Sequence, residues 1–194
     1  PELLPSCVAV LNPHQKDCPY PYKELAGCGV AYTLCRGLYM KRLGRDYDGT
    51  VELAALGTIA DVVSLTGENR ILVKEGMKRF IHTPIKGLAA LLKASGIVHD
   101  DTTEIRRADQ VSFGLAPRLN AAGRIARASE GVRLMTTESA EEAERLAQKL
   151  CEINTMRQQI ERDIFEQAKS RMAELGIEND MAVVVDGKDW HPGV

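Results

Sequence analysis

The sequence lacks the features that mark several large classes of protein. No apolar run approaches the roughly 20 residues needed to span a bilayer, and no basic stretch followed by an apolar one marks a secretory leader. The five cysteines are an odd number without CxxC spacing, which argues against a disulfide framework and against a zinc site. We therefore expect a cytoplasmic protein without a membrane span, whose thiols are reduced and not catalytic.

The chain also lacks an excess of charge of either sign. Its 25 Lys and Arg residues stand against 27 Asp and Glu residues, for a net charge of -2. Such a balance gives no overall attraction to nucleic acids or anionic membranes, so any site for a polyanion must be local. No P-loop, GxGxxG motif or Ser-His-Asp set is present. The 194 residues, 44% of them hydrophobic, fit one large domain or one domain with part of a second.

Two short apolar runs predict β-strands, and with the helices between them they indicate an α/β fold. The runs are CVAVL at 7–11 and MAVVV at 181–185, and short apolar runs of this kind are typical of buried strands. A strand without neighbours leaves its backbone groups unpaired. Since little of the chain follows the second run, we expect these residues to be part of a longer protein.

Helices are predicted over most of the remaining sequence. Helical runs begin at three places: Gly27, Asn69 and Pro84. The clearest signal lies at 139–176, where Ser139 and Glu142 form a capping box and Gly176 provides a stop, with no Gly or Pro between them. At 1.5 Å per residue this helix would be roughly 54 Å long. Such a helix either connects two bodies or forms a coiled-coil or bundle arm, and the pattern does not distinguish these.

The stretch GTIADVVSL at 57–65 places a single carboxylate, Asp61, between small and apolar residues. Gly57 permits close backbone approach on one side, and Val62 follows on the other. Two interpretations remain open. Asp61 caps a helix or accepts backbone N–H groups in a turn, or it is a metal ligand, because a divalent cation stabilises a carboxylate that is desolvated on one face.

A second group of polar residues lies in APRLNAAGRI at 116–125. Arg118, Asn120 and Arg124 supply forked hydrogen-bond donors, and the small residues around them allow backbone to approach a ligand. Six arginines and no lysine lie between residues 105 and 133, which favours planar recognition of phosphate or carboxylate. A solvated, salt-bridged helix face is the alternative. We also expect Pro117 to disfavour helix at the preceding residue.

His191 lies in the motif DWHPG at 189–193, directly after the second predicted strand. A histidine on the turn that leaves a strand can meet a ligand at the carboxyl edge of a sheet. A lone histidine is more often structural, so the motif by itself leaves both interpretations open.

Four motifs occur together in the order and approximate spacing of one family. They are GTIADVVSLTGENRILV (57–73), APRLNAAGRI (116–125), NTMRQ (154–158) and DWHPG (189–193). The segment at 12–32 is also similar to the one that follows this family's Asp-His-His motif. Over nearly its whole length the chain resembles RecJ, the single-stranded-DNA-specific 5′→3′ exonucleases of the DHH phosphoesterase superfamily, which act in DNA repair and recombination.

The resemblance implies roles for the residues singled out above. Asp61 would be a catalytic metal ligand in a centre of two Mn²⁺ or Mg²⁺ ions, a type of centre that activates water and stabilises the leaving oxygen. Arg118, Asn120 and Arg124 would bind substrate phosphate near this centre. His191 would lie at the start of a second domain that grips nucleic acid. The expected partner is single-stranded DNA, bound through its backbone.

The resemblance also implies a domain organisation. Residues 1–75 would be the C-terminal part of a DHH-type α/β catalytic domain, and 76–138 a helical region with the PRLNAAGR motif. Residues 139–176 would be a long inter-domain helix, and 177–194 the start of a DHHA1-like domain with its first strand.

Three family motifs are missing from these 194 residues, the Asp-rich, Asp-His-His and Gly-Gly-His motifs. Only Asp61 remains of the metal ligands, and one carboxylate cannot hold two cations that favour six or more oxygen ligands. We therefore expect the chain alone to be inactive. Two alternatives remain: a DHH-type oligoribonuclease or cyclic-dinucleotide phosphodiesterase, and a non-catalytic DNA-binding or replication scaffold.

Overall fold

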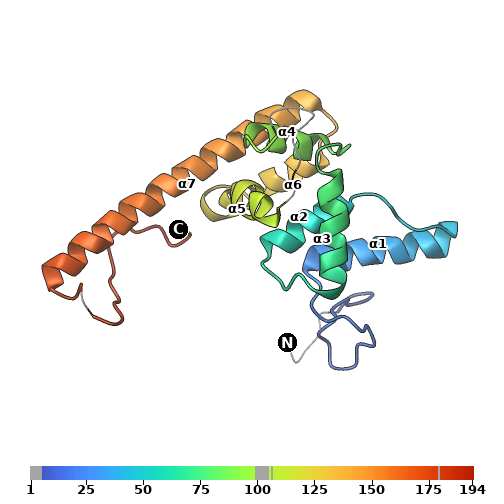
Figure 1. The fold of residues 1–194 in the computed structure, drawn as a ribbon, viewed down its shortest axis with the longest axis horizontal. Coiled ribbons are helices and arrows are strands. Elements are labelled where there is room, and N and C mark those ends of the chain that lie inside the picture. Colours follow the sequence, from blue (N-terminus) through green and yellow to red (C-terminus); the bar gives the residue numbers. More distant parts are fainter. Residues whose placement is uncertain (1–5, 99–104, 106, 179) are drawn as a thin grey trace. The chain divides into compact units, whose positions relative to one another are not determined.

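The computed structural model describes residues 6–98, 105, 107–178 and 180–194. Within these ranges the chain is helical and forms no β-strand. It divides into two compact units (Figure 1), one made of Pro1–Pro84 with Gly96–Ala116 and the other of Ile85–Ser95 with Pro117–Val194. No helix among the described residues combines the length and the apolar character that crossing a bilayer requires.

Both segments predicted as strands are irregular instead. Residues 7–11 and 181–185 consist of bends and irregular backbone without a ladder of hydrogen bonds. An apolar run forms a strand only where a neighbouring strand supplies partners for its backbone groups, and no described segment does so. The predicted α/β class is therefore not confirmed, while the predicted helical regions are.

The first unit is built around a buried central helix. Helix α2 (Val51–Ala60) packs against α1 (Gly27–Leu43), α3 (Gly67–Arg79) and the π-helix η1 (Gln110–Leu115). At Gly76 of α3, an added Cβ would lie 2.3 Å from the Cβ of Ala55 and 2.7 Å from the carbonyl oxygen of Val51. Glycine at this position therefore sets how closely α3 approaches α2.

The second unit contains α4 (Lys86–Ala94), α5 (Ala116–Ile125), α6 (Ser129–Thr136) and α7 (Ala140–Leu175). Helix α4 packs against α6 and against the first part of α7. Leucines from these three helices form its fully or almost fully buried core: Leu88, Leu91, Leu92, Leu134, Leu146 and Leu150.

The long helix predicted at 139–176 is confirmed as α7, with the predicted ends. The hydroxyl of Ser139 accepts the backbone N–H of Glu142 at 3.2 Å. The Glu142 carboxylate does not return to Ser139 as in a full capping box. It accepts the hydroxyl of Thr137 at 2.5 Å, and the Thr137 oxygen accepts the Ser139 N–H at 3.2 Å. Gly176 ends the helix in the left-handed conformation, with φ 67°.

Candidate functional site

Asp61 stands at the end of the buried helix α2. The helix ends at Ala60, and the Asp61 N–H donates to the carbonyl of Gly57 at 2.9 Å. An added Cβ at Gly57 would lie 2.6 Å from the Sγ of Cys28 in α1. The close approach predicted at Gly57 therefore occurs, but it joins two helices and does not make room for a ligand. Asp61 is thus carried by a helix whose position is fixed by packing.

The Asp61 side chain points to solvent. It is exposed, and it forms no hydrogen bond or ion pair with any described residue. The interpretation that this carboxylate caps a helix or accepts backbone N–H groups is therefore not supported among the described residues, where only the Asp61 backbone N–H takes part in the end of α2. A carboxylate without a protein partner is a hard oxygen donor of the kind that Mn²⁺ and Mg²⁺ prefer. Since no cluster of three or more His, Cys, Asp or Glu side chains occurs among the described residues, a cation held by Asp61 would need further ligands from outside them.

The residue after Asp61 has an unusual backbone conformation. Val62 has φ 56°, in the left-handed region, which is unfavourable for a β-branched residue. Its side chain is 84% exposed. Strain of this kind persists only where the surrounding structure holds it, and it is concentrated at functional sites.

The PRLNAAGR motif forms helix α5 and is preceded directly by the π-helix η1. The N–H of Ala116 donates to the carbonyl of Val111, and Ala116 has helical φ and ψ of -56° and -42°. The prediction that Pro117 disfavours helix at the preceding residue is therefore wrong. Proline lacks an N–H, and it lies here in the first turn of α5, directly after the π-helical turn. π-Helical turns inside helices are rare and occur frequently at functional sites.

The three polar residues of α5 have different surroundings. Asn120 and Arg124 are exposed and lie four positions apart, so they share one face of the helix. Arg118 is half-buried, and its guanidinium donates to the Sγ of Cys151 at 3.3 Å and to the carbonyl of Ser95 at 3.5 Å. It therefore ties α5 to α7 and to the end of α4. The alanines between them are fully buried, so they pack inside the unit and do not line a ligand site.

The turn that contains His191 lies against the end of α5. An added Cβ at Gly193 would lie 2.8 Å from the carbonyl oxygen of Arg124. His191 is half-buried, and its Nδ1 accepts the N–H of Gly193 at 3.0 Å. The neutral ring therefore carries its proton on Nε2. The second unit thus brings together two motifs that are far apart in the sequence, whereas Asp61 belongs to the first unit.

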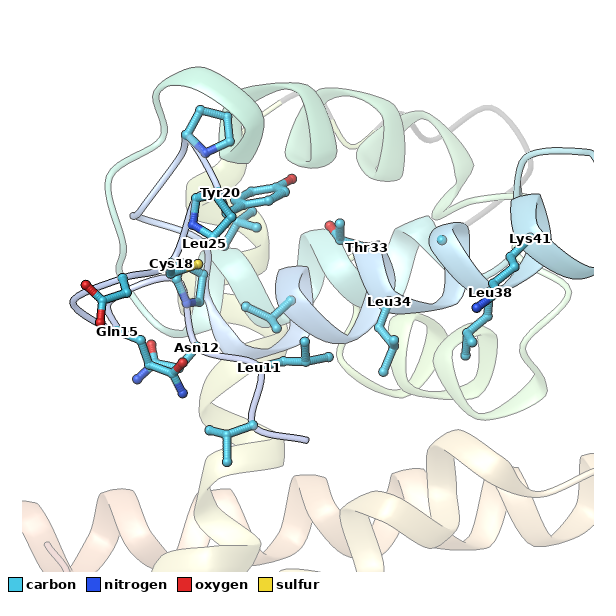
Figure 2. Close-up of a pocket in the computed structure, with 17 residues that line it drawn as sticks. Leu11, Asn12, Gln15, Cys18, Tyr20, Leu25, Thr33, Leu34, Leu38 and Lys41 are labelled. Atoms are coloured by element: carbon cyan, nitrogen blue, oxygen red, sulfur yellow. The ribbon is translucent and has the colours of Figure 1, made fainter. Parts of the chain in front are cut away.

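The first unit also contains an apolar groove, which could not be predicted from the sequence. It has a volume of about 730 Å³ and lies between the proline-rich segment and α1 (Figure 2). Leu11, Cys18 and Tyr20 line one side, and Leu34 and Leu38 of α1 line the other. These two leucines are 43% and 51% exposed. They lie four positions apart and share one face of α1, which the described residues leave partly exposed.

Comparison with known proteins identifies relatives for almost the whole chain. No protein-family model matches it. The single-stranded-DNA-specific exonuclease RecJ of Bacillus subtilis is 41% identical over 191 residues, which are 98% of this chain and 23% of the relative. The protein of the same name from Escherichia coli is 34% identical over 208 residues, which cover all of this chain and 35% of the relative.

A solved structure agrees with these relatives. The crystal structure of RecJ from Thermus thermophilus in complex with Mn²⁺ matches with a TM-score of 0.72 and 35% sequence identity. The match covers 92% of this chain and 25% of that one. The chain spans between about a quarter and a third of the length of the curated relatives it matches. Sequence and structure together show that nearly the whole chain is similar to part of RecJ proteins.

Proposed function

We propose that the chain is the inter-domain middle of a metal-dependent exonuclease that degrades single-stranded DNA from the 5′ end. One observation carries this proposal. Asp61 presents an exposed carboxylate, without a partner among the described residues, from the end of a buried helix. The chain that carries it is similar over nearly its whole length to RecJ proteins, one of which was crystallised with Mn²⁺.

The proposed reaction is phosphodiester hydrolysis with Mn²⁺ or Mg²⁺ as cofactor. A two-metal centre supplies activation of the attacking water and stabilisation of the leaving oxygen. Asp61 would be one ligand of that centre. Asn120 and Arg124 would donate to non-bridging phosphate oxygens, since charge-assisted bonds to phosphate are short and strong. His191 would donate from Nε2 to the same strand.

Arg118 has a supporting role in this proposal. Its contacts to Cys151 and to the Ser95 carbonyl hold α5 in place, so it orients the face that carries Asn120 and Arg124. Because Arg118 belongs to the PRLNAAGR motif, we include it among the proposed phosphate-binding residues. Its contacts within the unit support a role in positioning α5.

We further propose the domain organisation that the resemblance implies. Residues 1–75 would belong to a larger α/β catalytic domain, 76–138 to a helical region, 139–176 to an inter-domain helix and 177–194 to the start of a second domain. The apolar groove beside α1 supports the first assignment, because a complete domain would bury exposed leucines of this kind. The remaining metal ligands would come from the rest of that domain, so the 194 residues alone would be inactive. A DNA substrate also supports action in the cytoplasm.

The test uses the complete reading frame that encodes this chain, with Asp61→Asn as the variant. Asp48→Asn is the matched control, because Asp48 is also exposed and lies before the opposite end of α2. Loss of a residue that only supports a metal ligand costs about 10- to 100-fold. We therefore expect Asp61→Asn to lower Mn²⁺-dependent nucleotide release from 5′-labelled single-stranded DNA by more than about 100-fold, and Asp48→Asn to leave it unchanged.

The same assay separates the alternatives. Preference for short RNA over long single-stranded DNA would indicate an oligoribonuclease. Binding of single-stranded DNA without any Mn²⁺-dependent cleavage by the unmodified protein would indicate a scaffold and refute the enzymatic proposal.

A further inference from the structure

A buried amide ties the loop after Asp61 to a distant part of the chain. Asn69 lies in the first turn of α3 and is 0% exposed. Its Nδ2 donates to the carbonyl of Ser64 at 3.0 Å and to the carbonyl of Glu24 at 2.6 Å. Since carbonyl oxygens accept only from N–H or O–H groups, both partners fix the orientation of the amide. Ser64 lies three residues after Asp61, whereas Glu24 lies just before α1.

A tyrosine from the same distant segment holds the next part of the loop. The hydroxyl of Tyr22 donates to the carbonyl of Thr66 at 2.8 Å. The Tyr22 ring packs on Gly67, where an added Cβ would lie 2.5 Å from the ring and where φ is 47°. A side chain at Gly67 would thus be strained and would displace the ring. We call Tyr22 and Asn69 the loop clamp.

The strain at Val62 indicates what the loop clamp does. A β-branched residue in the left-handed region needs its surroundings to hold it there. The Val62 side chain is 84% exposed, so its own packing cannot supply the restraint. The restraint must act through the backbone on either side. Helix α2 fixes one side, and the loop clamp fixes the other at Ser64 and Thr66.

We propose that Tyr22 and Asn69 are positioning residues, which hold the turn after Asp61 so that its carboxylate is presented in one orientation to a divalent cation. This inference rests on the proposed function, in which Asp61 is a metal ligand. Neither side chain would contact the cation. Their effect is to order the ligand before binding, and residues that orient metal ligands in this way change metal affinity about 10- to 100-fold.

The experiment measures Mn²⁺ binding by titration calorimetry in the full-length protein. Tyr22→Phe removes only the hydroxyl and keeps the ring against Gly67, and Asn69→Ala removes the amide. Tyr32→Phe is the matched control, because the Tyr32 hydroxyl also donates to a backbone carbonyl, that of Tyr47 at 3.3 Å, before the opposite end of α2.

We expect the two loop-clamp variants to bind Mn²⁺ about 10-fold or more weakly and Tyr32→Phe to bind it normally. Because the Asp61 carboxylate is still present, saturating Mn²⁺ should restore cleavage in the loop-clamp variants. It should not restore cleavage in Asp61→Asn. In the metal-free protein, backbone amides of residues 62–66 should exchange hydrogen faster in Tyr22→Phe than in the unmodified protein.

The outcomes separate this inference from the proposed function. If Asp61→Asn loses Mn²⁺ affinity and Tyr22→Phe keeps it, the loop clamp is only structural and the inference fails. If Asp61→Asn itself keeps full Mn²⁺ affinity, the proposed function fails first. Should Asn69→Ala not fold, Tyr22→Phe decides, since it deletes one hydroxyl group from a half-buried side chain.

Discussion

Replacing Gly76 with alanine tests the close contact on which the position of Asp61 depends. The new Cβ would lie 2.3 Å from the Cβ of Ala55 and 2.7 Å from the carbonyl oxygen of Val51. Carbon atoms pack at about 3.5–4.0 Å, and both neighbours belong to the fixed part of α2, so the helices must move apart. Overpacking costs about 1–3 kcal/mol, whereas alanine gains about 1 kcal/mol of helix propensity over glycine.

The contact is more than about 1 Å too short, so the overpacking cost should lie near its upper limit. We therefore expect Gly76→Ala to lower the free energy of unfolding by about 1–2 kcal/mol. Gly37 provides the matched control. It also lies inside a helix of the first unit, α1, and an added Cβ there would meet no atom within 4 Å. Only the propensity gain remains, and Gly37→Ala should raise the free energy of unfolding by about 1 kcal/mol.

Urea unfolding followed by circular dichroism measures both variants of the chain at one temperature. The two free energies of unfolding should differ by about 2–3 kcal/mol, with opposite signs relative to the unmodified chain. If Gly76→Ala proves as stable as Gly37→Ala, α2 and α3 do not approach as closely as described, and the argument that packing fixes Asp61 is refuted.

Arg124→Ala in the full-length protein should weaken binding to single-stranded DNA and reduce the slope of log affinity against log salt concentration by about 0.7. Arg162→Ala on α7 is the control. An unchanged slope in Arg124→Ala would exclude Arg124 from phosphate binding. The hydroxyl of Thr137, together with neighbouring arginines, lowers the pKa of Glu142 below its ordinary value. This stabilisation is present above the unfolded-state pKa and is lost as the pH falls through the lower folded-state pKa. Glu142→Gln should therefore reduce the loss of unfolding free energy at acidic pH, and Glu141→Gln should leave that loss unchanged. If the free energy of unfolding falls equally with decreasing pH in the unmodified chain and both variants, the stabilising role of the Glu142 carboxylate is contradicted.

Features encoded in neighbouring residues could be predicted from the sequence. The ends of α7 follow from Ser139 and Gly176, because helix caps act within one turn. The strands predicted at 7–11 and 181–185 are not confirmed, because an apolar run reflects local composition, whereas a strand depends on partners elsewhere in the chain. The expectation that Pro117 disfavours helix at Ala116 was wrong, because Ala116 continues the π-helical turn in front of the proline.

The candidate site could be predicted only in part for the same reason. The position of Asp61 at the end of an element followed from the residues around it. The desolvated face expected for its carboxylate is not found, because Asp61 and Val62 are both exposed, and its ligand role stays a prediction. The loop clamp was not predicted. Asn69 and its partner Glu24 lie 45 positions apart, and Tyr22 lies in a proline-rich segment whose pattern indicates only an irregular loop.

Helix α7 is continuous in geometry but divided in how it is held. Its buried residues all lie between Ala143 and Asn154, and residues 155–175 contain none. Beyond Asn154, the side-chain hydrogen bonds that join the helix to other described residues run to the chain that follows it, from Trp190 to Gln167 and from Arg171 to Asp186. Within its unit the helix is therefore held by packing at its N-terminal part only. A force applied to its C-terminal end would act as a torque on its first turns, where it is resisted by the buried leucines of α7.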